Sequence, residues 1–123
     1  MKPSERRRKR SSFAGLALQY WLNAVAQRKR LMAIVLADSA GLVVASSFKG
    51  PEAEELAALA PLLARSGERD AVLEASIPDL PLKIEPMKID RTALYLCAVG
   101  APDRMGTGLR LAKGGVQRIL TTH

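Results

Sequence analysis

Two apolar segments joined by a four-residue turn constrain the fold of this chain more than any other feature. Residues 31–37 are apolar at every position, and residues 42–48 carry two adjacent valines before they fade into serines. Side chains alternate between the faces of a sheet, so a strand that is apolar throughout is buried on both faces. Asp38 can bond its own backbone and Gly41 can take a positive φ, which predicts a short hairpin loop with a bulge. Neighbouring segments must then cover both faces.

A first helix is expected before this hairpin. Ser11 or Ser12 can cap it, and it should run to about Gln27. Its apolar residues recur at helical spacing and define one face, made of Phe13, Leu16, Ala17, Tyr20, Trp21 and Ala24. Arg28, Lys29 and Arg30 then follow at the negative end of the helix dipole, where cations are favoured.

A second helix is expected after the hairpin, from Pro51 to Ser66. Proline is favoured at the first helical position, and glutamates suit the positive end of the helix dipole. Pro61 lies inside the helical pattern and is expected to kink or divide the helix. The apolar stripe is unusually wide and contains Ala53, Leu56, Ala57, Leu59, Ala60, Leu62, Leu63 and Ala64.

Three further strands are expected in the second half of the chain. Residues 71–77 form a weak candidate, residues 82–89 a clearer one, and residues 93–99 a mostly apolar run typical of a central strand. Within residues 82–89 the alternation slips by one position at Pro86, which predicts a bulge or an edge strand there. Asp90 and Arg91 are expected to form the turn that follows.

A last helix is expected over residues 105–121. Gly114 and Gly115 lie inside it, so either the helix breaks there or the glycines allow close packing on the sheet. The order helix, two strands, helix, three strands, helix predicts an α+β fold, a three-layer α/β/α domain with a five-stranded antiparallel sheet. At 123 residues the chain is long enough for one such domain and too short for two.

Positive charge is concentrated in the first 30 residues. They hold nine of the 19 basic residues and one of the 12 acidic ones, whereas the formal net charge of the chain is +7. Residues 1–10 are therefore predicted to be a disordered basic arm, and residues 11–123 the single folded domain. The arm can be a solvated tail or can contact nucleic acid, an anionic membrane or an acidic protein through Arg6, Arg7, Arg8, Lys9 and Arg10.

Residues that carry catalysis are scarce. The single histidine is His123, so no serine or cysteine has an evident histidine base, and no Cys/His cluster has the spacing of a metal site. Cys97 lies in an expected strand and is interpreted as a small core residue. The glycines around Thr107 lack the third glycine and the Gly-Lys-Ser/Thr of phosphate loops. The sequence predicts no enzyme, metal or cofactor.

Three segments together resemble the roadblock / dynein light-chain family. Residues 35–46 (VLADSAGLVVAS) resemble its hairpin, residues 54–60 (EELAALA) its second helix, and residues 93–99 (ALYLCAV) followed by 108–111 (GLRL) its last strand and helix. The resemblance covers about residues 12–121. It implies a homodimer in which the second helix and the third strand meet their counterparts, through Leu56, Leu59, Ala60, Leu63, Val72 and Leu73.

The resemblance also implies the function. Family members are mostly non-enzymatic scaffolds or regulators of small Ras-like GTPases, or light chains of motor complexes. A cytoplasmic location is expected because the one cysteine suits a reducing compartment and no apolar run approaches the length of a membrane span. A secretory signal is the alternative for the N-terminus, but Gln19 and Asn23 interrupt its apolar stretch. Nucleic-acid or acidic-surface binding through the arm is the alternative function.

Overall fold

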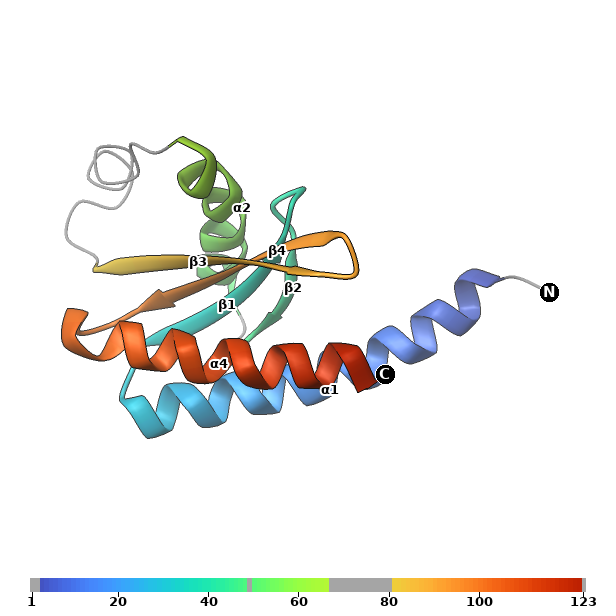
Figure 1. The fold of residues 1–123 in the computed structure, drawn as a ribbon, viewed down its shortest axis with the longest axis horizontal. Helices are drawn as coiled ribbons and strands as arrows, with labels where there is room; N and C mark the ends of the chain where they lie inside the picture. Colours follow the sequence, from blue (N-terminus) through green and yellow to red (C-terminus); the bar gives the residue numbers. More distant parts are fainter. Residues whose placement is uncertain (1–2, 49, 67–80, 123) are drawn as a thin grey trace.

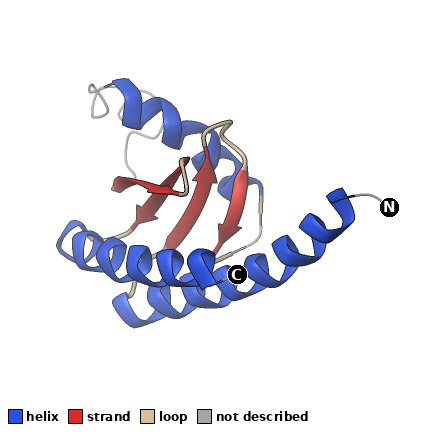
Figure 2. Ribbon diagram, turned by 45° about the vertical axis from the view of Figure 1, so that its right-hand side comes forward, coloured by secondary structure: helices blue, strands red, loops and turns tan. Residues whose placement is uncertain are grey.

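A computed structural model describes residues 3–48, 50–66 and 81–122 of the chain. The four strands form one antiparallel sheet in the order β2-β1-β4-β3. One helix, α2, covers one face, while α1 and α4 lie side by side on the other (Figures 1 and 2). In chain order the elements are α1 (Pro3–Lys29), β1 (Ala33–Asp38), β2 (Val43–Ser46), α2 (Pro51–Ser66), β3 (Leu82–Ile89), β4 (Thr92–Val99) and α4 (Pro102–Thr122).

The α+β class and the antiparallel sheet agree with the sequence prediction. The described residues contain four strands, whereas five were expected. The missing candidate, residues 71–77, lies outside the described residues, so the fifth strand and the complete element order stay predictions.

The hairpin has the geometry that its sequence predicts. Asp38 Oδ1 accepts hydrogen bonds from the backbone N–H groups of Ala40 (2.9 Å) and Leu42 (3.0 Å), and Gly41 has φ = 81°. The register between β1 and β2 shifts after Leu36, which is the expected bulge. Five of the six β1 residues are buried, so this strand is enclosed on both faces.

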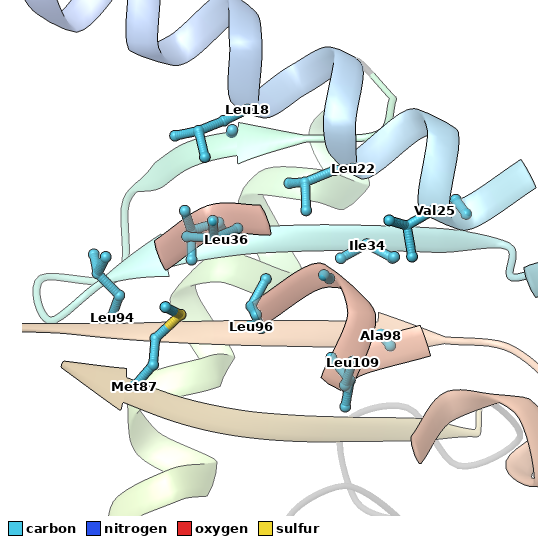
Figure 3. Packing of buried hydrophobic residues seen from close by; sticks show 14 of the residues in the cluster. Leu18, Leu22, Val25, Ile34, Leu36, Met87, Leu94, Leu96, Ala98 and Leu109 are labelled. Atoms are coloured by element: carbon cyan, nitrogen blue, oxygen red, sulfur yellow. The ribbon is translucent and has the colours of Figure 1, made fainter. Parts of the chain in front are cut away.

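Alternate side chains of β1 feed two separate cores. Ile34 and Leu36 lie in the larger core, against α1 and α4. Figure 3 shows them between Leu18, Leu22 and Val25 of α1 and the side chains of β3, β4 and α4. The intervening Val35 and Ala37 lie in the smaller core under α2.

The sequence predicts a bulge or an edge strand at Pro86, and of these two the bulge is absent. β3 pairs with β4 without a shift, from Leu82 opposite Val99 to Ile89 opposite Thr92, and β3 is an edge of the described sheet. The apparent slip has another cause. Ile84 is buried under α2, whereas Met87 is buried on the opposite face, where α4 contacts β3, so the two halves of β3 are buried on different faces.

The turn between β3 and β4 has two residues, as predicted. Asp90 and Arg91 have φ values of 49° and 71°. Positive φ at both positions suits the type I′ turn, whose twist matches that of the flanking strands.

The first helix differs from its prediction in two respects. It begins at Pro3 rather than at Ser11 or Ser12, so residues 3–10, expected to be disordered, are helical. No proline separates these residues from the rest of the helix, and arginine and lysine are good helix formers. The buried stripe also differs from the predicted apolar face, because it consists of Ala14, Leu18, Leu22, Val25 and Ala26.

The last helix is unbroken at its glycines. Gly115 is buried against Trp21 of α1, and a Cβ atom at this position would overlap the indole ring. Trp21 Nε1 donates a hydrogen bond to the Ala112 carbonyl oxygen at 3.0 Å. The close packing that the sequence allowed therefore occurs at Gly115, but against a helix rather than the sheet.

Candidate interaction surfaces

The inner face of α2 is part of the core. Leu56, Ala60 and Leu63 are only 5%, 0% and 2% exposed, and they pack with Val35 and Cys97 of the sheet. All three were expected at the dimer interface. Their burial within one chain leaves them almost no surface for a second copy.

The outer face of α2 presents other residues. Leu62 is 55% exposed, Leu59 is half-buried, and Ala58 and Glu55 are exposed. The stripe of leucines and alanines is wide enough to reach both faces of the helix, and helical periodicity alone does not show which face turns inward. Val72 and Leu73, the other two expected interface residues, lie outside the described residues.

The hairpin loop holds the middle of α2. A Cβ atom at Gly41 would lie 3.1 Å from Ala58 Cα, so the loop rests directly on the helix backbone. The helix continues through Pro61, which is buried, and is not divided there. α2 is therefore fixed on both sides, by the sheet beneath and by the loop beside it.

Charge differs between the two helical layers. α1 and α4 together contain eleven basic residues, seven in α1 and four in α4, with Glu5 and Asp103 as their only acids. α2 contains Glu52, Glu54 and Glu55, with Arg65 as its only basic residue. The two outer layers thus carry opposite net charge.

The five basic residues from Arg6 to Arg10 lie in the first turns of α1. Figure 1 shows these turns extending past the end of α4, away from the sheet. The structure therefore places the basic run on a helix that continues into the folded domain.

Reactive groups in the described residues are buried or dispersed. Cys97 lies in β4 beneath α2, and burial raises the pKa of its thiol to about 12. The thiol is therefore protonated at neutral pH and is a poor nucleophile. Within residues 3–48, 50–66 and 81–122, no three His, Cys, Asp or Glu side chains form a group that could hold a metal ion. In the same residues no helix is both long and apolar enough to span a bilayer.

Comparison with known proteins identifies the fold. No family model and no curated protein sequence matches the chain. The solved structure of Myxococcus xanthus MglB is similar, with a TM-score of 0.58 and 12% sequence identity, over 87% of this chain and 90% of MglB. MglB has a roadblock fold, and the present chain has a roadblock-like domain. At this identity the similarity establishes the fold alone.

Proposed function

We propose that this protein is a non-enzymatic, homodimeric scaffold or regulator that binds a small Ras-like GTPase in the cytoplasm. One observation carries the proposal, the similarity of fold to MglB over most of both chains. MglB is a roadblock-fold GTPase-activating protein. The described residues add no clustered acids, histidines or ionised thiol that favour chemistry by this chain itself.

The outer face of α2 is the surface that supports dimerisation. Leu59 and Leu62 present apolar area there, while the inner residues of the helix are already buried. Apolar side chains exposed in this way are typical of surfaces that become buried on association. The proposed dimer contacts therefore keep Leu59, which the resemblance implies, and use Leu62 in place of the buried Leu63.

Sedimentation velocity at micromolar concentration tests dimerisation. We expect a dimer of the 13.3 kDa chain, and Leu62→Glu should weaken it at least about tenfold by burying an unpaired charge. Leu16→Glu is the matched control, because Leu16 is 51% exposed on the opposite layer. A monomeric wild-type chain, or equal weakening by both variants, would contradict the proposed interface.

Binding to GTPases tests the function. Purified small Ras-like GTPases from the same genome, loaded with GDP or a non-hydrolysable GTP analogue, are mixed with the chain and examined by calorimetry. We expect one GTPase to bind with a preference for one nucleotide state, and parallel hydrolysis assays distinguish activation from scaffolding. Absence of binding to every GTPase in both states would refute the proposal.

Binding of nucleic acid or an anionic surface through the N-terminal basic run is the alternative function. The observation that favours it is the position of Arg6 to Arg10 on a helix that extends from the domain. Deleting residues 1–10 should abolish binding to duplex DNA or to anionic vesicles, and binding by the whole chain should fall steeply with salt. Binding that survives the deletion would exclude the run as its cause.

A further inference from the structure

Helix α1 is apolar on more than the face that the domain buries. Between Ala14 and Ala26 it carries no charged residue, and only Gln19 and Asn23 are strongly polar. Leu16 is 51% exposed and Tyr20 is 71% exposed on its outer side. A helix with only one buried face normally carries charged residues opposite that face, so the outer side of α1 has the composition of a contact surface.

A groove runs along the outer seam between α1 and α4. It consists of two adjoining hollows of about 390 Å³ and 60 Å³, which share Trp21 and Ala24 as lining residues. α1 and α4 run in opposite directions along it (Figure 1). The α1 side is lined by Ala17, Tyr20, Trp21, Ala24, Val25 and Arg28, and the α4 side by Leu111, Gly115, Arg118 and Ile119.

The dimensions of the groove suit a third helix. The α1 residues from Ala17 to Arg28 span about 16 Å at a helical rise of about 1.5 Å per residue, which is about three turns. Ala17 and Ala24 have no bulky side chain and allow a helix backbone to approach closely. Trp21 is held over Gly115 by its hydrogen bond to Ala112, so the floor of the groove is already formed without a ligand.

The charge around the groove selects the partner. Arg28 lines the groove, and no acidic residue occurs between residues 14 and 30 or between residues 104 and 122. A second copy that docked the same face would bring like charges together, which is unfavourable. We propose that the seam between α1 and α4 binds an amphipathic helix of another protein, with its apolar stripe over Trp21 and its flanks carrying Asp or Glu.

Trp21 provides a direct signal for this proposal, because it is the only tryptophan of the chain and lies in the groove. The probe is a lactam-bridged peptide of about four turns that has leucines at helical spacing, glutamates on both flanks and no tryptophan. We expect a saturable change in Trp21 emission at micromolar peptide. The same peptide with its lactam bridges kept and with lysine in place of every flanking glutamate should give no saturable change.

A matched pair of variants locates the binding site. Ala24→Glu places a carboxylate in the wall of the groove and should weaken binding of the acidic peptide at least tenfold. Ala40→Glu makes the same change at an exposed alanine of the hairpin loop, away from the groove, and should leave binding unchanged. Circular dichroism of both variants confirms that they fold.

Four results would overturn the proposal. These are no saturable change up to about 1 mM acidic peptide, equal binding of the lysine peptide, and equal binding by the Ala24→Glu variant. The fourth is self-association of the chain that Ala24→Glu abolishes, because a second copy would then occupy the groove. Phosphatidylglycerol vesicles are tested separately, and a Trp21 response to vesicles without a response to the peptide assigns the groove to a membrane instead.

Discussion

The two faces of the sheet are covered in different ways. On one side the single helix α2 packs mainly small side chains, such as Ala53, Ala57 and Ala60, against the strands. On the other side α1 and α4 share the cover and contribute larger side chains, including Leu18, Leu22 and Leu109. The small residues let one helix lie close to the sheet, whereas two helices need longer side chains to fill the space between them and the strands.

The outer surfaces of the two helical layers also differ in composition. α2 turns exposed leucine and glutamate outward, while the seam of α1 and α4 turns aromatic, small and basic residues outward. Surfaces of opposite charge on opposite sides of one small domain discriminate between partners, because like charges disfavour the wrong docking. A dimer through α2 leaves the seam accessible.

Adjacent leucines of α2 give the largest expected contrast. Leu63→Ala removes a side chain that is 2% exposed and should lower the free energy of unfolding by about 2–5 kcal/mol. Leu62→Ala removes one that is 55% exposed and should change it by less than about 0.5 kcal/mol in the monomer. Urea denaturation at one fixed protein concentration measures both. Equal losses would show that the inner face of α2 is assigned wrongly.

Gly115 tests the opposite face. Gly115→Ala places a methyl group in the space of the Trp21 ring, and we expect the free energy of unfolding to fall by about 1–3 kcal/mol. The Trp21 hydrogen bond to Ala112 should be lost as well, which will shift the tryptophan emission. A variant with unchanged stability and emission would mean that α1 and α4 pack less closely than described.

The free energy of unfolding is expected to fall at alkaline pH because of Cys97, which lies in the core under α2. Burial raises the pKa of its thiol from 9.0 to about 12, so the unfolded chain ionises first as pH rises. The stability that burial of the neutral thiol contributes is fully present below pH 9. It is lost as pH rises from 9 towards 12. Between pH 8 and 10 the wild type should lose about 1 kcal/mol more than Cys97→Ala. Parallel urea midpoints for the two proteins over this range would contradict the burial.

Gly114→Ala is expected to have the smallest effect, and it should stabilise the fold rather than destabilise it. No atom lies within 4 Å of a Cβ built at this position, and the residue is helical. Gly114→Ala should therefore raise the free energy of unfolding by about 0.5–1 kcal/mol, by removing the entropic cost of glycine in a helix. Thermal denaturation beside Gly115→Ala measures the contrast, and destabilisation by both would imply a contact on the outer side of α4.

Local chemistry made several elements predictable from the sequence. The bounds of α2 follow from Pro51 and Ser66, and β3 occupies the expected residues 82–89. The hairpin loop was predictable from Asp38 and Gly41. The Asp38 carboxylate accepts hydrogen bonds from backbone N–H groups within four residues, and Gly41 takes the positive φ of the turn. Signals of this kind act between neighbours in the chain and need no knowledge of the rest of the fold.

The orientation of the helices was not predictable in this way. α1 and α2 each carry apolar residues on two faces, and only contacts with distant strands decide which face is buried. Leu18 and Leu22 were therefore missed, and Leu56 and Leu63 were placed on the surface rather than in the core. The small residues Ala17 and Ala24 were the one sign of a groove in the sequence. Its other wall could be predicted only once α4 was placed beside α1.

The pairing of β1 with β4 has a consequence for how the chain acquires its fold. Ala33 pairs with Val99 and Asp38 with Leu94, so the central contact of the sheet joins residues more than fifty positions apart. The hairpins β1–β2 and β3–β4 need only short loops to close, whereas this contact requires a long one, which slows folding. During synthesis β1, apolar at nearly every position, remains without its central neighbour until β4 has left the ribosome. The nascent chain is therefore exposed to aggregation until then, and a chaperone that shields β1 would matter most in that interval.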